Sequence, residues 1–389
     1  MENSRRLFIR RISLSGAIIA GSSSFLKGIS VSKDSNLAIN PPFLSNANKV
    51  PISLLVDDSC PLIHVFWFHA KQVDGKGDNR HGQFQVKQVD GKGPFTTDGR
   101  LLVKDVPNSF LDKFCAVVTK NNMAGKISIV PAPGGVGDIV NGIPGYDKSL
   151  ITKWLNTAKN RLSDRFDFSP EMLTHNLALD LKTGKYLEEN ESEWSKHQDR
   201  STFIPYFIRC LNLLKEAGIN ASGITSPWTF GKLVESEFVE SMIVAQKEVY
   251  NHELSWYFLH TFYDQPGEKP WIALKKENCT LVSIPGNMPD HFWETINSPK
   301  TDTEYIKSIA DKYITADGKE GDIINVLKAG GWPIFVTHWQ SLYSNGLETG
   351  LKALKEVGRR INTPLKDKVE WKSCMELTKL TVEQVKGDS

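Results

Sequence analysis

Cysteine is scarce in this chain of 389 residues. The five cysteines are odd in number, widely spaced and mostly set in apolar runs: Cys60, Cys115, Cys210, Cys279 and Cys374. A disulfide framework or a zinc knuckle would need cysteines in pairs or at short, regular spacings. We therefore predict that these cysteines are buried small hydrophobic side chains.

Long hydrophobic runs and an excess of one charge are also missing. The apolar stretch Ile12 to Leu26 is too short and too polar for a stable membrane span. With 47 Lys+Arg against 45 Asp+Glu, the chain has no basic field of the kind that binds nucleic acid. The composition implies no protein partner. These absences predict a protein that neither binds nucleic acid nor spans a membrane stably.

The first residues resemble an export signal. Ser4-Arg5-Arg6-Leu7-Phe8-Ile9-Arg10 is similar to the twin-arginine pattern, and a mildly apolar, Gly- and Ser-rich segment follows it. The alternative is a basic amphipathic N-terminal helix of a cytosolic protein. We predict a signal peptide over residues 1–35 and a bacterial protein that is periplasmic or secreted.

The rest of the chain has the rhythm of an α/β protein. Residues 36–50 are rich in Asn, Pro and Ser and predict a linker, and residues 51–389 show no further shift in composition. The segment Lys71–Gly77 recurs word for word as Lys87–Gly93, which predicts a duplicated surface loop over 71–93. Seven or eight predicted strands, most of them followed by helices, favour a single (β/α) barrel with seven strands.

The first strand ends in two neighbouring carboxylates, Asp57 and Asp58. The apolar run before them, Ile52 to Val56, is typical of a central strand that is covered on both faces. Parallel sheets and barrels carry their chemistry at the carboxyl ends of their strands. Other predicted strands also end in reactive or aromatic side chains, so all of these would face one mouth: Glu171, His175, Trp228, His260 and His338.

Four of these segments resemble the motifs of the polysaccharide deacetylases of carbohydrate esterase family 4, in the family's order. Val56-Asp57-Asp58-Ser59 resembles the first motif, in which a strand ends in a general base and a metal ligand. Glu171 to His175 resembles the second, in which a Glu precedes a metal-binding His by four residues. Ser226-Pro227-Trp228 is similar to part of the third motif, which lines the substrate groove. Phe335 to His338 resembles the last, whose His acts as general acid.

The resemblance implies a role for each matching residue. Asp57 would be the general base and His338 the general acid, while Asp58 and His175 would bind a divalent metal such as zinc. Glu171 is predicted to belong to the catalytic group, although its carboxylate could instead bond the backbone beneath the site. A metal of this kind lowers the pKa of bound water from about 16 toward about 7.

The chain also departs from the family. Leu179 stands where the family has its second His, the third motif lacks its Arg, and the fourth motif, which contains a tryptophan and an aspartate, is not evident. The third metal ligand would then be a replacement such as His64 or His69, or the metal would be absent.

The predicted substrate is a carbohydrate. Aromatic faces at strand ends could stack on sugar rings or pack in the core, and Trp228 and Trp339 are the predicted contacts. Gln340 and Asn345 could bond sugar hydroxyls. We predict a hydrolase that deacetylates a polysaccharide or oligosaccharide with a metal. The alternatives are a glycoside hydrolase that uses two carboxylates such as Asp58 and Glu171, and a degenerate barrel that binds sugar without turnover.

Overall fold

The computed structural model describes residues 49–68 and 95–387. All of these described residues belong to one compact unit. The predicted signal peptide, nearly all of the linker, the duplicated loop and His69 lie outside the described residues. Those predictions therefore stay predictions.

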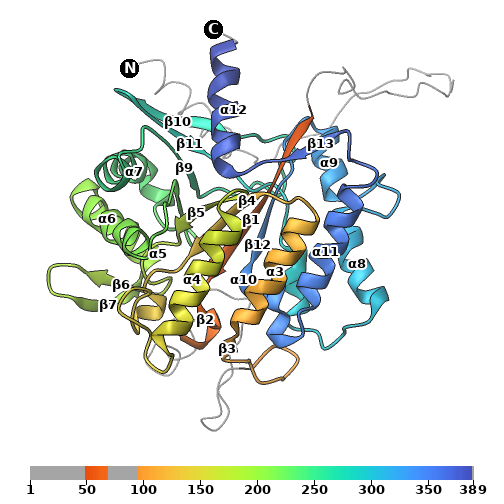
Figure 1. Cartoon of the computed structure of the whole chain (residues 1–389). Coiled ribbons are helices and arrows are strands. Elements are labelled where there is room, and N and C mark those ends of the chain that lie inside the picture. Colours follow the sequence, from red (N-terminus) through yellow and green to blue (C-terminus); the bar gives the residue numbers. More distant parts are fainter. Residues whose placement is uncertain (1–48, 69–94, 388–389) are drawn as a thin grey trace, which may run out of the picture. The chain divides into compact units, whose positions relative to one another are not determined.

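The described residues alternate between short strands and longer helices (Figure 1). The strands are β1 Val50–Ser59, β2 Leu62–Ile63, β3 Asp105–Val106, β4 Gly125–Ile129, β5 Phe166–Pro170, β6 Leu177–Asp180, β7 Lys185–Asn190, β8 Gly223–Thr225, β9 Leu254–Phe258, β10 Trp271–Lys276, β11 Cys279–Ser283, β12 Ile334–His338 and β13 Val369–Trp371. The α-helices are α3 Asn108–Lys120, α4 Lys148–Leu162, α5 Glu191–Ser195, α6 Arg200–Glu216, α7 Glu235–Tyr250, α8 Thr303–Tyr313, α9 Asp322–Lys328, α10 Trp339–Tyr343, α11 Thr349–Ile361 and α12 Cys374–Gly387. Short 3₁₀ turns are η2 Pro133–Gly135, η3 Lys232–Val234, η4 His291–Thr295 and η5 Ser344–Gly346.

Two sheets of mainly parallel strands form the centre of this unit. The first has the order β12-β1-β4-β5, with β13 also paired to β1, and all of its pairs are parallel. The second has the order β10-β11-β9-β8 and is parallel except for the antiparallel pair β10–β11. Isolated parallel bridges join the two sheets, from Phe168 to Ala221 and from Glu171 to Thr225 on one side, and from Met288 to Phe335 on the other.

The expected seven-stranded barrel is thus present only in part. The order β1-β4-β5-β8-β9-β11-β12 follows the expected course, but among the described residues no continuous ladder of hydrogen bonds closes it. One reason lies in the segment beside β12, where Pro285 and Pro289 flank the single bridge at Met288. Because proline has no backbone N–H, this segment cannot extend the ladder. The fold is a mixed α/β fold built on parallel sheets.

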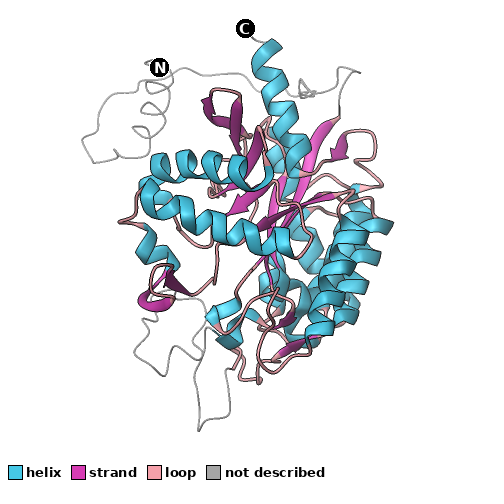
Figure 2. Ribbon diagram, turned by 60° about the vertical axis from the view of Figure 1, so that its left-hand side comes forward, coloured by secondary structure: helices cyan, strands magenta, loops and turns pink. Residues whose placement is uncertain are grey.

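Helices cover the outer faces of the strands. Figure 2 shows the strands running through the interior with helices around them, and in Figure 1 α3, α4 and α11 lie outside β1, β4 and β12. Every residue of β1 after Val50 is buried, as expected for a strand that is covered on both faces. No helix among the described residues is long and apolar enough to cross a membrane.

Several predicted boundaries differ from the structure. The strand expected over 166–175 ends at Pro170, and the region 271–285 contains the hairpin β10–β11. The charged segment 188–199, expected as a loop, contains the short helix α5. All five cysteines are free, and all except the half-buried Cys279 are buried, which confirms that prediction.

Candidate active site

Asp58, Glu171 and His175 meet at the carboxyl ends of β1 and β5. His175 Nε2 lies 2.8 Å from Asp58 Oδ1 and 3.5 Å from Glu171 Oε1. One donor atom from each of the three residues lies within 4.8 Å of the others, and all three residues are buried. Two carboxylates and an imidazole are donors that zinc and similar divalent metals accept. These residues could therefore hold a metal.

The backbone takes an unusual shape to bring this group together. Asp58, Met172 and His175 have φ angles of 60°, 47° and 52°, in the left-handed region that side-chain-bearing residues rarely adopt. At Asp58 the pairing of β1 with β4 shifts register between Val56 and Ser59. Such strain persists only where surrounding contacts enforce it, and it is concentrated at functional sites.

Glu191 holds the loop that carries His175. Its buried carboxylate accepts hydrogen bonds from the backbone N–H groups of Leu173, Thr174 and His175, at 3.0, 2.9 and 2.8 Å. The hydroxyl of Tyr206 donates to the same carboxylate at 2.6 Å. Sequence reasoning missed this residue because a glutamate in a charged segment carries no sign of burial.

The charges of Asp58, His175 and Glu171 shift one another's pKa values. Burial alone would raise the pKa of Asp58, but the positive charge and hydrogen bond of His175 outweigh it and keep that pKa well below its usual range. Burial alone would lower the pKa of His175, but the negative charges and hydrogen bonds of Asp58 and Glu171 outweigh it and raise that pKa well above its usual value. Burial, followed by the negative charges of Asp58 and Asp57, raises the pKa of Glu171 to about 7.

Glu171 also supports the site from beneath. Its Oε2 accepts a hydrogen bond from the backbone N–H of Asp58 at 2.6 Å and another from the Ser128 hydroxyl. Thus Glu171 both faces His175 through Oε1 and bonds the backbone through Oε2, which combines the two roles considered from the sequence. The third member of the donor group is therefore Glu171, whereas the sequence predicts a histidine, His64 or His69, in that role.

Asp57 has different partners from its neighbour Asp58. It is 4% exposed, and its carboxylate forms an ion pair with Lys126 Nζ. Lys126 lies on β4, is fully buried and also donates to Thr225 Oγ1 at 2.9 Å. Lys126 is a functional candidate that sequence reasoning missed. Its one signal is a charged side chain at the start of the largely apolar run Lys126–Ala132, which is rare where both faces of a strand are covered.

His338 lies at the end of β12, opposite Asp57 in the parallel register. Its Nδ1 lies 2.8 Å from Asp290 Oδ2, and Ser341 Oγ donates to the same oxygen at 2.9 Å. The Trp293 ring stands edge-on, with its centroid 4.7 Å from that of His338. An aspartate and a tryptophan therefore contact the proposed acid. Asp290 was not recognised in the sequence, and Trp293 was noted only among the tryptophans that could stack on a sugar ring.

These contacts keep a proton on His338. Burial opposes the charge, but the hydrogen bond to Asp290 and the negative charges of Asp58, Asp290 and Asp57 outweigh it and raise the pKa of His338 to about 9. Its side chain is 27% exposed, compared with 4% for His175. A protonated imidazole that solvent can reach is suited to donate a proton.

The predicted substrate contacts fall into two groups. Trp228 is 36% exposed, and its ring centroid lies 4.5 Å from that of His175, so its indole lies at the site and is open to solvent. Gln340 is buried; its Nε2 bonds Asp58 Oδ2, and its Oε1 has no partner among the described residues.

Trp339 and Asn345 lie elsewhere, and a direct contact with sugar is not supported for either. Trp339 is 2% exposed and packs against Phe110, Phe114 and Trp154 in the core. Asn345 uses both ends of its amide on the backbone, accepting from the N–H of residue 103 at 2.7 Å and donating to the carbonyl of residue 101 at 3.1 Å.

His64 is near the group but is not part of it. It is 1% exposed, and its Nε2 has no partner among the described residues. Burial lowers the pKa of His64 to about 3 against the opposing effect of Asp58, so the imidazole is neutral. Two buried polar atoms near Asp58, His64 Nε2 and Gln340 Oε1, thus lack partners. Because buried polar atoms are nearly always bonded, they fit a site that binds a further group.

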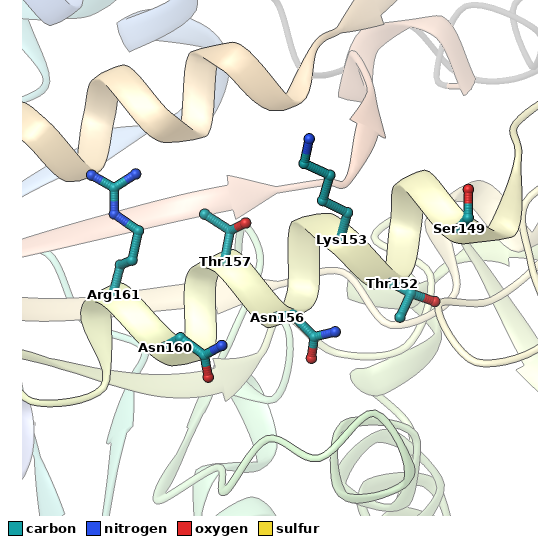
Figure 3. Close-up of a pocket in the computed structure, with 7 residues that line it drawn as sticks. All are labelled: Ser149, Thr152, Lys153, Asn156, Thr157, Asn160 and Arg161. Atoms are coloured by element: carbon teal, nitrogen blue, oxygen red, sulfur yellow. The ribbon is translucent and has the colours of Figure 1, made fainter.

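One hollow on the surface lies away from this chemistry. It has a volume of about 520 Å³ and is lined by residues of helix α4 alone, none of which belongs to the Asp58 group (Figure 3). Its lining is polar and comes from one exposed helix face: Ser149, Thr152, Lys153, Asn156, Thr157, Asn160 and Arg161. Nothing in it points to catalysis.

Comparisons with known proteins give structural likeness only. No protein-family model and no curated protein sequence matches the chain. The fold is similar to that of a "putative polysaccharide deacetylase" from Mycobacterium smegmatis, with 12% identity and a TM-score of 0.45, over 90% of this chain and 96% of that one. A weaker likeness, with 9% identity and a TM-score of 0.33, is to 4-alpha-glucanotransferase from Thermococcus litoralis, over 69% of this chain and 37% of that one.

Proposed function

We propose that this protein is an exported, metal-dependent hydrolase that removes acetyl groups from a polysaccharide or oligosaccharide. The observation that carries the proposal is that the metal-type donors and the two candidates for proton transfer are separate residues at the strand ends. Asp58, Glu171 and His175 form a buried group of metal-type donors, while Asp57 and His338 each have a separate charged partner, Lys126 and Asp290.

Asp58, Glu171 and His175 would hold the metal. When bound, a divalent cation supplies positive charge that polarises the acyl carbonyl and favours ionisation of water. Asp58 already accepts a hydrogen bond from Gln340 Nε2 and lies against His175, so its carboxylate is oriented before a metal arrives. Preorganised ligands of this kind lose little freedom on binding.

Asp57 and His338 would move the protons. The Asp57 carboxylate would take a proton from the attacking water as its oxygen adds to the acyl carbon. As the bond from that carbon to the sugar nitrogen or oxygen breaks, His338 would return a proton to the leaving atom. Asp290 keeps His338 protonated before the reaction, because it raises the pKa of that imidazole to about 9.

Trp228 would bind the sugar. Its exposed indole lies beside His175, and a flat aromatic face of this kind suits the apolar face of a pyranose ring. A glycoside hydrolase built on Asp58 and Glu171 is less well supported. Glu171 is 2% exposed and its Oε2 is bound to the Asp58 backbone and to Ser128, so it is poorly placed to protonate a glycosidic oxygen.

Acetate release from acetylated glycans tests the proposal. The zinc-loaded full chain should release acetate, should stop when a chelator removes the metal, and should recover when zinc is added back. Shortened glycans produced by metal-free protein would contradict the proposal and support a glycoside hydrolase. Glycan binding with no turnover would support the non-catalytic alternative.

A further inference from the structure

Two neighbouring aspartates at the end of β1 have entirely different surroundings. Asp58 bonds His175 and Gln340, whereas Asp57 bonds Lys126 and lies 3.3 Å from Ser128 Oγ. Carboxylates on adjacent residues could both reach a bound cation. In this structure the group of converging donors includes Asp58 and leaves out Asp57.

Lys126 is the feature that separates them. Its side chain is 0% exposed, and its ammonium group has fixed partners on three sides. It pairs with Asp57, donates to Thr225 Oγ1 at 2.9 Å and lies 4.9 Å from the centroid of the Phe258 ring. Thr225 Oγ1 is in turn 2.8 Å from Ser169 Oγ, which fixes the hydroxyl.

Stability does not explain a lysine at this position. A buried ion pair is weak evidence for stabilisation, since apolar side chains of similar volume often stabilise a core at least as well. The strand around Lys126 is buried on every residue, where a central parallel strand is ordinarily apolar. A reason for the lysine therefore has to be sought in the arrangement that it enforces.

We infer that Lys126 is a positioning residue that holds the Asp57 carboxylate away from the Asp58–Glu171–His175 group. Asp57 then stays outside the metal shell and remains directed at the attacking water. The inference rests on the proposed function, because it assigns a purpose to the separation of base from ligands. Lys126, on the neighbouring strand β4, is thereby added to the residues that support catalysis.

Cobalt in the full chain provides a test with a readout besides activity. In Lys126→Met, Asp57 loses its partner and is expected to enter the Co²⁺ shell, which raises the coordination number and weakens the visible absorption. Asp57→Asn alone should keep the wild-type spectrum, and the double variant should return to it. Lys126→Arg, which keeps the charge and hydrogen bonds, should also match the wild type.

Turnover supplies the second readout. Lys126→Met should lower kcat by about 100-fold, the loss expected for a catalytic group displaced by about 1 Å. KM should change by less than about threefold, because the substrate contacts are untouched. Lys126→Arg should recover most of the lost kcat.

The outcomes separate this inference from the proposed function. A Lys126→Met variant with the wild-type cobalt spectrum and wild-type kcat would overturn the inference and leave the proposed function standing. A wild-type chain that binds no Co²⁺ would overturn both. If circular dichroism shows that Lys126→Met does not fold, Lys126→Gln, which keeps a hydrogen-bond donor, is judged by the same two readouts.

Discussion

The site contains two histidine–aspartate pairs with the same spacing and different settings. His175 Nε2 lies 2.8 Å from Asp58, and His338 Nδ1 lies 2.8 Å from Asp290. The His175 side chain is 4% exposed and a second carboxylate, that of Glu171, lies on the same nitrogen. The His338 side chain is 27% exposed, and no described residue bonds its Nε2.

This difference shows how surroundings decide the role of a common unit. Where a second carboxylate converges on the same buried nitrogen, the pair becomes half of a metal shell. Where one carboxylate holds one nitrogen and the other nitrogen faces solvent, the pair can carry a proton to a substrate. Four predictions test whether the two pairs can be separated in this way, from the largest effect to the smallest.

Removing His175 should abolish both metal binding and activity. In His175→Ala the donor group loses its only nitrogen and leaves Asp58 and Glu171 as two buried carboxylates without a cation. Metal content by mass spectrometry and acetate release should both fall to background. The exposed His197 provides the control, since His197→Ala should behave as the wild type. Full metal content in His175→Ala would contradict the assignment of the His175–Asp58 pair to the metal site.

Removing His338 should slow turnover strongly and leave metal binding intact. General acid catalysis contributes about 10² to 10⁴ in rate, so kcat of His338→Ala should fall within that range. Metal content should stay at the wild-type level because His338 lies outside the donor group. Loss of metal together with activity would mean that the two pairs form one unit.

Loosening the loop under His175 should weaken metal binding by an intermediate amount. Glu191→Gln keeps the size of the side chain but loses the charge that holds three backbone N–H groups. Outer contacts of metal ligands are typically worth about 10- to 100-fold in metal affinity, and a loss of that size is expected by isothermal titration. Glu188→Gln, in the exposed strand nearby, should leave the affinity unchanged.

Weakening the second pair should shift a pH profile rather than abolish a function. His338 donates only when protonated, so activity should fall as the pH rises through its pKa of about 9. Asp290→Asn removes a negative partner, which should lower that pKa toward its ordinary value and move the alkaline limb down by about one pH unit or more. Rates measured from about pH 6 to about pH 10 would show the shift, because this range spans the ordinary pKa of a histidine and the raised pKa of His338. If the alkaline limb of the pH–rate profile stays in place in Asp290→Asn, a group other than His338 determines it.

Residue type and hydrophobic pattern are enough to predict which candidate groups lie at strand ends. Asp57, Asp58 and His338 lie at strand ends because parallel strands share one carboxyl edge, and that follows from the apolar runs before them. Glu171 and His175 were expected on a strand, but β5 stops at Pro170, and both residues are brought to the site by a loop.

The supporting residues could not be predicted because their roles depend on contacts distant in the sequence. Lys126 meets Asp57 across 69 positions, and Asp290 meets His338 across 48. Nothing local distinguishes Glu191 from the exposed glutamates before it. Trp339 illustrates the converse error, since an aromatic residue at a strand end packs into the core as readily as it lines a groove.

Anomalous diffraction from crystals of the zinc-loaded protein tests the central claim most directly. One peak is expected at the zinc edge between Asp58 Oδ1, Glu171 Oε1 and His175 Nε2, with distances of about 2.0 to 2.2 Å and with Asp57 outside the shell. Density at this position would establish the donor group as a metal site. Its absence from fully loaded crystals, or a zinc ion bound elsewhere on the chain, would contradict the account.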